Sequence, residues 1–242
     1  MVYLQKLITM ILLMKTFMED GKTLQAMQKA VEAQTLSRTL DDVMFNEDVQ
    51  AIILQAQKVI DSLSKNGNIL TAQTLIFYLR TYYEGTSRND KYDHWDKKLD
   101  DVNLKVALLR QYAPKHMHSL FVKRAELHGD DPPQPYNEQA SNNWIERIDG
   151  IEPNIVIRSL DIAASEHMSN VSWETLIVGG LNSVLKLGVT PVIAETFAKA
   201  ADKEKQELWL NAINEELRSC SEYLLHIPGK RVLNQILSRI LE

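Results

Sequence analysis

The sequence predicts an all-α protein, built either as a multi-helix bundle or as an irregular stack of antiparallel helix hairpins. Apolar residues recur at helical spacing along most of the 242 residues. Glycine and proline are scarce, with nine and seven copies, and no proline precedes Pro114. No stretch shows the sustained apolar–polar alternation of a half-buried strand. With 45% apolar and 24% charged residues, the chain has the composition of a soluble globular protein.

The first segment of the chain reads MVYLQKLITMILLMKTFM and is predicted to form a helix that is apolar on all sides. One side carries Leu7 and Ile11, and the other side carries Leu12. Lys6 and Lys15 enclose only eight residues, whereas a membrane span needs about 20, and no small-residue cleavage site follows. Such a helix must be covered on both sides, either by the rest of the fold or by a partner.

Residues 47–83 predict two amphipathic helices joined as an antiparallel hairpin. Asn46 suits the N-cap of the first helix, whose apolar residues run from Val49 to Leu63. The short polar turn that follows Leu63 leaves room only for an antiparallel return.

The next part of the chain predicts a loop and two further helices. The polar stretch 84–93 is interpreted as the loop, and a helix with a narrow apolar seam begins at Trp95. Pro114 is expected in the first turn of a helix that ends near His128.

The clearest interruption of the helical pattern lies at residues 129–142, GDDPPQPYNEQASN. Three prolines and the lack of any large aliphatic residue indicate a linker or a long surface loop. We therefore predict an N-terminal helical subdomain at 1–128, this linker at 129–142 and a C-terminal helical subdomain at 143–242.

The second half predicts several shorter helices with recognisable starts. Ser172 and Asp202 are placed to cap helices, and Thr190 is interpreted as a cap followed by a proline in the first turn. The pair Gly179-Gly180 lies inside an apolar helical pattern, which predicts a close helix–helix contact or a kink.

Composition and motifs argue against nucleic-acid binding and against the metal, nucleophile and nucleotide sites that have familiar sequence motifs. The formal charge of −5 and the absence of long basic runs disfavour nucleic-acid binding. Cys220 is the only cysteine and lies in an apolar helical pattern, which predicts a small buried side chain in a reducing, cytoplasmic compartment. The sequence has no HExxH, paired CxxC, GxSxG or GxGxxG motif. We predict no catalytic residue, no cofactor and no metal ligand, and the balance favours a protein that is not an enzyme.

A group of aromatic residues at 77–95 includes Tyr78, Tyr82 and Trp95 and surrounds Arg80. Tyrosine, tryptophan and arginine are the residues that dominate protein interfaces. The same residues would also form a core beneath a polar loop, and the sequence leaves both interpretations open.

The preferred functional hypothesis is a non-catalytic protein–protein interaction module, an adaptor, a chaperone-like factor or a soluble subunit of a larger assembly. One version is a component of a bacterial secretion or coupling complex. The first and last helices carry more apolar surface than an isolated chain end needs, so they are expected to bind another protein or a second copy. The residues predicted to bind the partner are Leu7, Ile11, Leu12, Met14, Tyr78, Tyr82, Trp95, Ile236 and Ile240.

Two alternatives belong to other functional classes. A helical-bundle enzyme, or a protein that binds a small ligand or metal, would place its site between helices. A viral or phage structural or nucleocapsid subunit would need a continuous positive groove.

Overall fold

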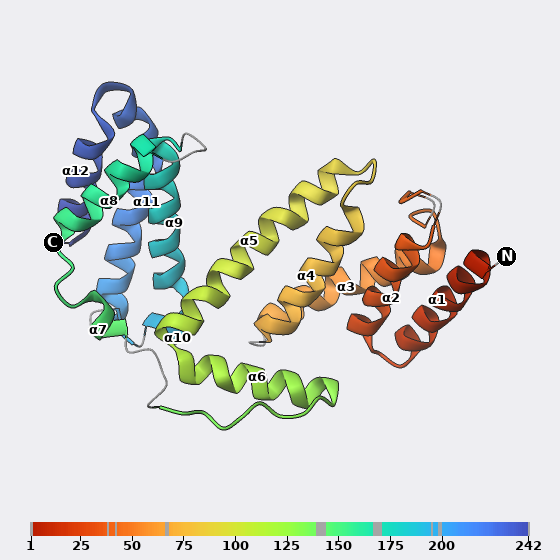
Figure 1. Cartoon of the computed structure of the whole chain (residues 1–242). Helices are drawn as coiled ribbons and strands as arrows, with labels where there is room; N and C mark the ends of the chain where they lie inside the picture. Colours follow the sequence, from red (N-terminus) through yellow and green to blue (C-terminus); the bar gives the residue numbers. More distant parts are fainter. Residues whose placement is uncertain are drawn as a thin grey trace. The chain divides into compact units, whose positions relative to one another are not determined.

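A computed structural model describes residues 2–37, 39–41, 43–65, 68–138, 144–166, 171–194, 196–197 and 200–241. Within these ranges the regular structure is α-helical and no β-strand occurs, which confirms the all-α prediction (Figure 1). The helices are α1 (Val2–Glu19), α2 (Thr23–Thr35), α3 (Glu47–Lys65), α4 (Ile69–Tyr83), α5 (Asn89–Tyr112), α6 (Pro114–His128), α7 (Trp144–Ile148), α8 (Pro153–Glu166), α9 (Trp173–Val189), α10 (Pro191–Ala194), α11 (Lys203–His226) and α12 (Gly229–Leu241).

The chain divides into two compact units. Unit 1 comprises Met1–Val106 and Met117–Tyr136, and unit 2 comprises Ala107–His116 and Asn137–Glu242. One cut, between Tyr136 and Asn137, lies inside the predicted linker 129–142, and the segment Ala107–His116 at the junction of α5 and α6 belongs to unit 2. Independent folding of 1–128 and 143–242 stays a prediction.

Unit 1 is built on the predicted hairpin of α3 and α4. Helix α2 packs against both helices of the hairpin, and α1 packs along α2 and touches α3. The amide nitrogens of Asp48 and Val49 donate to Asn46 Oδ1 at 3.0 and 3.2 Å, which confirms Asn46 as the N-cap of α3. The core consists of the apolar faces of these helices and includes Met27, Ile52, Ile53, Ile60, Leu75, Ile76 and Leu79.

Two buried or half-buried polar side chains join the helices of unit 1. The Gln34 amide of α2 donates to the Tyr82 carbonyl at 2.7 Å. The Arg80 guanidinium of α4 donates to Asp96 at 3.1 Å and to the Tyr92 hydroxyl at 2.5 Å. Tyr92 lies in the stretch expected to be a loop, and that expectation is wrong there, because α5 begins at Asn89 and uses Tyr92 and Trp95 to cover α4.

Unit 2 has its own core, formed by α8, α9, α11 and α12. Helices α9 and α11 pack along each other, and α12 packs against α8, α9 and α11. The most buried residues of this core are Ile177, Leu181, Ile213, Cys220, Val232 and Ile236. Burial of Cys220 confirms the prediction that it serves as a small hydrophobic residue.

The three predicted caps of unit 2 are present in the structure. Ser172 accepts from the Thr175 amide at 3.1 Å, and Asp202 accepts from the amides of Glu204 and Lys205, so both are N-caps. Thr190 is a cap and Pro191 is the first residue of α10, as predicted, but the Thr190 hydroxyl donates to the Lys186 carbonyl at 2.8 Å, so the residue caps the C-terminus of α9.

The close helix contacts of unit 2 involve other glycines than the predicted pair. Gly179 and Gly180 are exposed on α9, and a Cβ at either would meet no atom within 4 Å, so the prediction of a close contact there is wrong. A Cβ at Gly188 would lie 2.7 Å from a Leu210 methyl carbon, and one at Gly229 would lie 2.1 Å from Trp173 Cγ. At both of these glycines a Cβ would collide with a side chain of another helix.

Candidate partner-binding surface

Four of the residues predicted to bind a partner are part of the core of their own unit. Met14 and Tyr82 are fully buried, and Trp95 and Ile236 are almost so. Burial of the Tyr82 ring raises the pKa of its hydroxyl far above the ordinary tyrosine value. These four side chains stabilise the units and cannot touch another protein while the units stay folded.

Four other predicted residues are half-buried. Leu7, Ile11 and Tyr78 pack against the core of unit 1, and Ile240 packs against the core of unit 2. The apolar side of α12 is therefore used within unit 2. What α12 presents outward is polar: Lys230, Arg231, Asn234, Gln235 and Ser238.

Leu12 is the one predicted residue that lies on the surface. It is 59% exposed, and it lies beside Ile8, which is 51% exposed, and Leu13, which is 37% exposed. Helix α1 buries Met14 and half-buries Leu7 and Ile11, and the helical repeat of 3.6 residues turns Ile8 and Leu12 to the other side. We call Ile8, Thr9, Leu12, Leu13 and Thr16 the outer face of α1.

The two threonines make this outer face more apolar than its sequence suggests. The Thr9 hydroxyl donates to the Gln5 carbonyl at 2.8 Å, and the Thr16 hydroxyl donates to the Leu12 carbonyl at 3.2 Å. Hydroxyls that bond back to their own helix leave their methyl groups to face outward. The five residues of the outer face are uncharged, and the exposed charges of Lys6, Lys15 and Glu19 border them.

A salt bridge between α1 and α3 borders the outer face. Lys15 Nζ lies 2.8 Å from Asp48 Oδ2, and this hydrogen bond raises the pKa of the lysine. Because both side chains are exposed, the pair contributes little to stability. The pair compensates the charge of Lys15 at the edge of the outer face and leaves Leu12 uncovered.

Unit 2 carries further exposed isoleucines that sequence reasoning missed. They are Ile145 and Ile148 of α7, Ile151 between α7 and α8, and Ile155 and Ile162 of α8. Their spacing does not define one helical face, because α7 ends at Ile148 and the chain turns at Gly150 before α8 begins at Pro153. Exposed charges of both signs, including Arg147, Asp149 and Arg158, lie among these isoleucines.

Titratable side chains are dispersed over the described residues. No three His, Cys, Asp or Glu side chains among them come together as a metal site would require. His94 packs edge-on against the Trp95 ring, 5.0 Å between centroids, and its pKa is lowered by burial and by Lys98 and Lys91. The buried carboxylate of Glu216 binds Arg239 at 2.8 Å, which joins α11 to α12.

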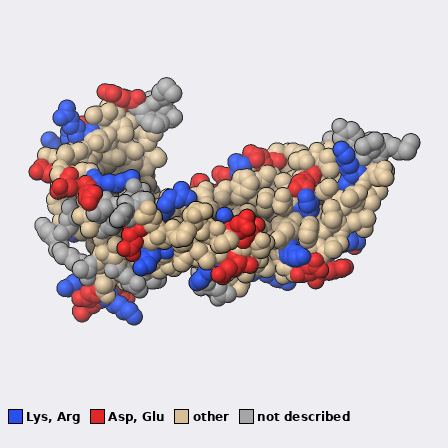
Figure 2. Space-filling model, turned by 60° about the horizontal axis from the view of Figure 1, so that its bottom comes forward, with Lys and Arg blue, Asp and Glu red and all other residues tan. Residues whose placement is uncertain are grey.

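The charges of the described surface are mixed. On the face that Figure 2 shows, Lys and Arg side chains alternate with Asp and Glu in both units. This face has no extended positive region of the kind that phosphate backbones select.

None of the described helices has the length and apolar character that a bilayer crossing requires.

Comparison with known proteins gives no relative: no protein-family model, no curated protein and no solved structure matches this chain.

Proposed function

We propose that this protein is a non-catalytic interaction module that docks a partner protein on the outer face of α1. The observation that carries the proposal is the uncharged surface of Ile8, Leu12 and Leu13, flanked by threonines whose hydroxyls are already bonded. Single exposed apolar residues are ordinary, but adjacent ones on one helical face favour an interface.

The geometry supports a helix-in-groove mode of binding. Ile8 and Leu12 are one turn apart, the spacing at which an amphipathic helix places its anchors in an apolar groove. Burying such side chains contributes about 25 cal/mol for each Å² of apolar surface. The threonine hydroxyls would lose no hydrogen bond on binding, so their burial costs little.

A partner for α1 agrees with a role as adaptor, chaperone-like factor or subunit of a larger assembly. The narrower hypothesis of a bacterial secretion or coupling complex has only the acidic, helical character of the chain in its favour. We keep the broader role as the proposed function.

The test compares two leucine-to-glutamate substitutions of equal exposure. Leu12→Glu places a charge on the outer face of α1, and Leu54→Glu places the same charge on α3, where the leucine is 56% exposed. Each tagged full-length chain is purified from its native host, and the co-purifying proteins are identified and quantified by mass spectrometry. Light scattering over a range of concentrations measures self-association.

We expect a stoichiometric partner, or a second copy, that Leu12→Glu releases and Leu54→Glu retains. A glutamate in a desolvated interface costs several times the thermal energy, so the bound fraction should fall at least about tenfold. A native protein that purifies as a strict monomer without any stoichiometric partner would contradict the proposal. Equal binding by both variants would contradict it as well.

A further inference from the structure

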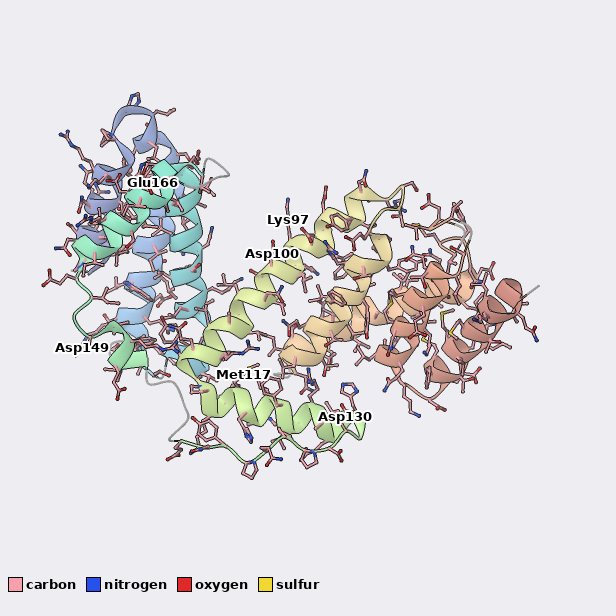
Figure 3. All side chains as sticks on the ribbon, in the orientation of Figure 1. Lys97, Asp100, Met117, Asp130, Asp149 and Glu166 are labelled. Atoms are coloured by element: carbon pink, nitrogen blue, oxygen red, sulfur yellow. The ribbon has the colours of Figure 1, made fainter. Side chains whose placement is uncertain are left out.

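The proline-rich segment that follows α6 folds back onto that helix. The chain turns at Gly129, whose φ of 69° is left-handed, and the Asp130 amide donates to the Ala125 carbonyl at 3.0 Å. Residues 131–136, which we call the strap, then return alongside α6 (Figure 1). In Figure 3, Met117 marks the beginning of α6 and Asp130 marks the turn.

One histidine of α6 holds the strap in place. His118 Nε2 is 2.7 Å from the Gln134 carbonyl oxygen, to which it donates as an N–H. The His118 ring also lies 5.7 Å from the Tyr136 ring, with a tilt of 56°. Together with the turn at Gly129, these contacts place the second half of the strap beside the beginning of α6.

The exposure of the strap follows a period of three residues. Pro133 and Tyr136 are half-buried, whereas Pro132 and Pro135 are exposed. A polyproline II helix has three residues per turn, so residues three apart share a face. Proline fixes φ and forces the preceding residue to be extended, and the order Pro132-Pro133-Gln134-Pro135 leaves the backbone little other choice.

We propose that the strap is a docking site for a partner domain with an aromatic-lined groove and a basic rim, and that Pro132 and Pro135 enter that groove. Prolines at i and i+3 on one face of a polyproline II segment are what such grooves bind. The strap is already held in shape by α6, so less conformational entropy is lost on binding. The exposed carboxylates of Asp130 and Asp131 lie directly before the prolines, and their negative charge favours a partner groove with a basic rim.

The contacts of Tyr136 limit which residues of the strap a partner groove can bind. Its ring lies against His118 and faces α6, so it is not available as an anchor for a groove that needs a tyrosine after the prolines. The strap therefore fits a groove that reads two prolines three residues apart. This inference uses no residue of α1 and does not depend on the proposed function.

The experiment titrates the full chain with isolated SH3 domains, which bind such proline pairs, by isothermal calorimetry. One set of domains carries Lys or Arg at the rim of the groove, and a matched set carries Asp or Glu. We expect binding by the basic set, with an affinity at least about tenfold lower in the double variant Pro132→Ala/Pro135→Ala. The control is Pro153→Ala, an exposed proline in the first turn of α8, which should bind as the native chain does.

A second variant covers the case in which the loss of two prolines disturbs folding. Asp130→Lys/Asp131→Lys keeps every proline and should reduce the affinity for the basic set by a similar factor while the circular dichroism spectrum stays native. Binding by no domain of the basic set would overturn the proposal. An affinity that neither double variant changes would overturn it too, as would an equal loss in Pro153→Ala.

Discussion

Replacing Gly229 by alanine should destabilise unit 2. Gly229 is the first residue of α12 and is buried against the indole of Trp173 at the start of α9. A Cβ there would lie 2.1 Å from Trp173 Cγ and 2.5 Å from its Cβ and Cδ2. Carbon atoms in contact are normally about 3.5–4.0 Å apart. The crowded atoms are those nearest the backbone of Trp173, so rotation of the side chain cannot relieve the clash and the helices must shift.

The expected magnitude follows from two opposing effects. Overpacking a well-packed core costs about 1–3 kcal/mol, and a forced helix shift belongs to the upper part of that range. Alanine in place of glycine recovers less than about 1 kcal/mol, because Gly229 is in the first helical turn and not in the helix interior. We therefore expect Gly229→Ala to lower the free energy of unfolding by about 2 kcal/mol.

The control is the same substitution where space is open. Gly180 lies in the interior of α9, and a Cβ there would meet no atom within 4 Å. Gly180→Ala should raise the free energy of unfolding by about 0.5–1 kcal/mol, since it only reduces backbone entropy in the unfolded chain. The two glycine-to-alanine changes thus have opposite signs.

Urea unfolding of the full chain, followed by circular dichroism and tryptophan fluorescence, measures both effects. The variant Trp173→Ala provides a coupling test, because it removes the atoms that a Cβ at Gly229 would strike. Trp173→Ala should cost less in the Gly229→Ala background than in the native chain. The reasoning is refuted if Gly229→Ala changes stability by less than about 0.5 kcal/mol, or if the two substitutions are additive.

Three further predictions concern stability and pH. Met14→Ala should cost about 2–5 kcal/mol in urea unfolding, whereas Leu12→Ala on the same helix should cost less than about 0.5 kcal/mol. The buried Tyr82 hydroxyl has no hydrogen-bond partner among the described residues, so Tyr82→Phe should leave stability unchanged or higher. Because burial raises the pKa of Tyr82 above 10.0, the native chain should lose stability as the pH rises beyond 10.0, and Tyr82→Phe should lose less in alkaline melts. The backbone amide of Lys205 is the main cause of the lowered pKa of Asp202, which lies below 3.8. The ionised cap therefore stabilises α11 above pH 3.8, and this stabilisation is lost as the pH falls further. In acid melts, Asp202→Asn should show no such loss of stability.

The helices could be predicted because their signals are local. Asn46, Ser172 and Asp202 cap the helices that their sequence neighbours indicate, and the 3.6-residue repeat fixes the rest. Thr190 is also a cap, but the sequence does not show which helix its hydroxyl serves, and only the geometry at the end of α9 decides for the Lys186 carbonyl. Gly229 could not be found at all, since its neighbour Trp173 is distant in the chain.

The candidate surface could be predicted only in part. The sequence shows that α1 is apolar on every side, but it cannot show which side the fold covers. Tyr82 and Trp95 illustrate the same problem in the opposite sense, because interface residues and core residues have the same composition. Their burial in the core of unit 1 is a tertiary fact that no spacing reveals.

The comparison of α12 with α1 gives the proposed function its physical basis. In α12 the buried residues Val232 and Ile236 have polar residues on the opposite side of the helix. The sequence of α12 therefore indicates which side is exposed to solvent. In α1 the side opposite Met14 carries Leu12, which contributes little to the stability of unit 1 because it is mostly exposed. The fold therefore supplies no reason for a leucine at that position, and an exposed apolar group adds a risk of aggregation. A partner that buries Leu12 supplies the reason. If the Leu12→Glu variant keeps the native free energy of unfolding but no longer binds the partner, then Leu12 serves binding and not folding.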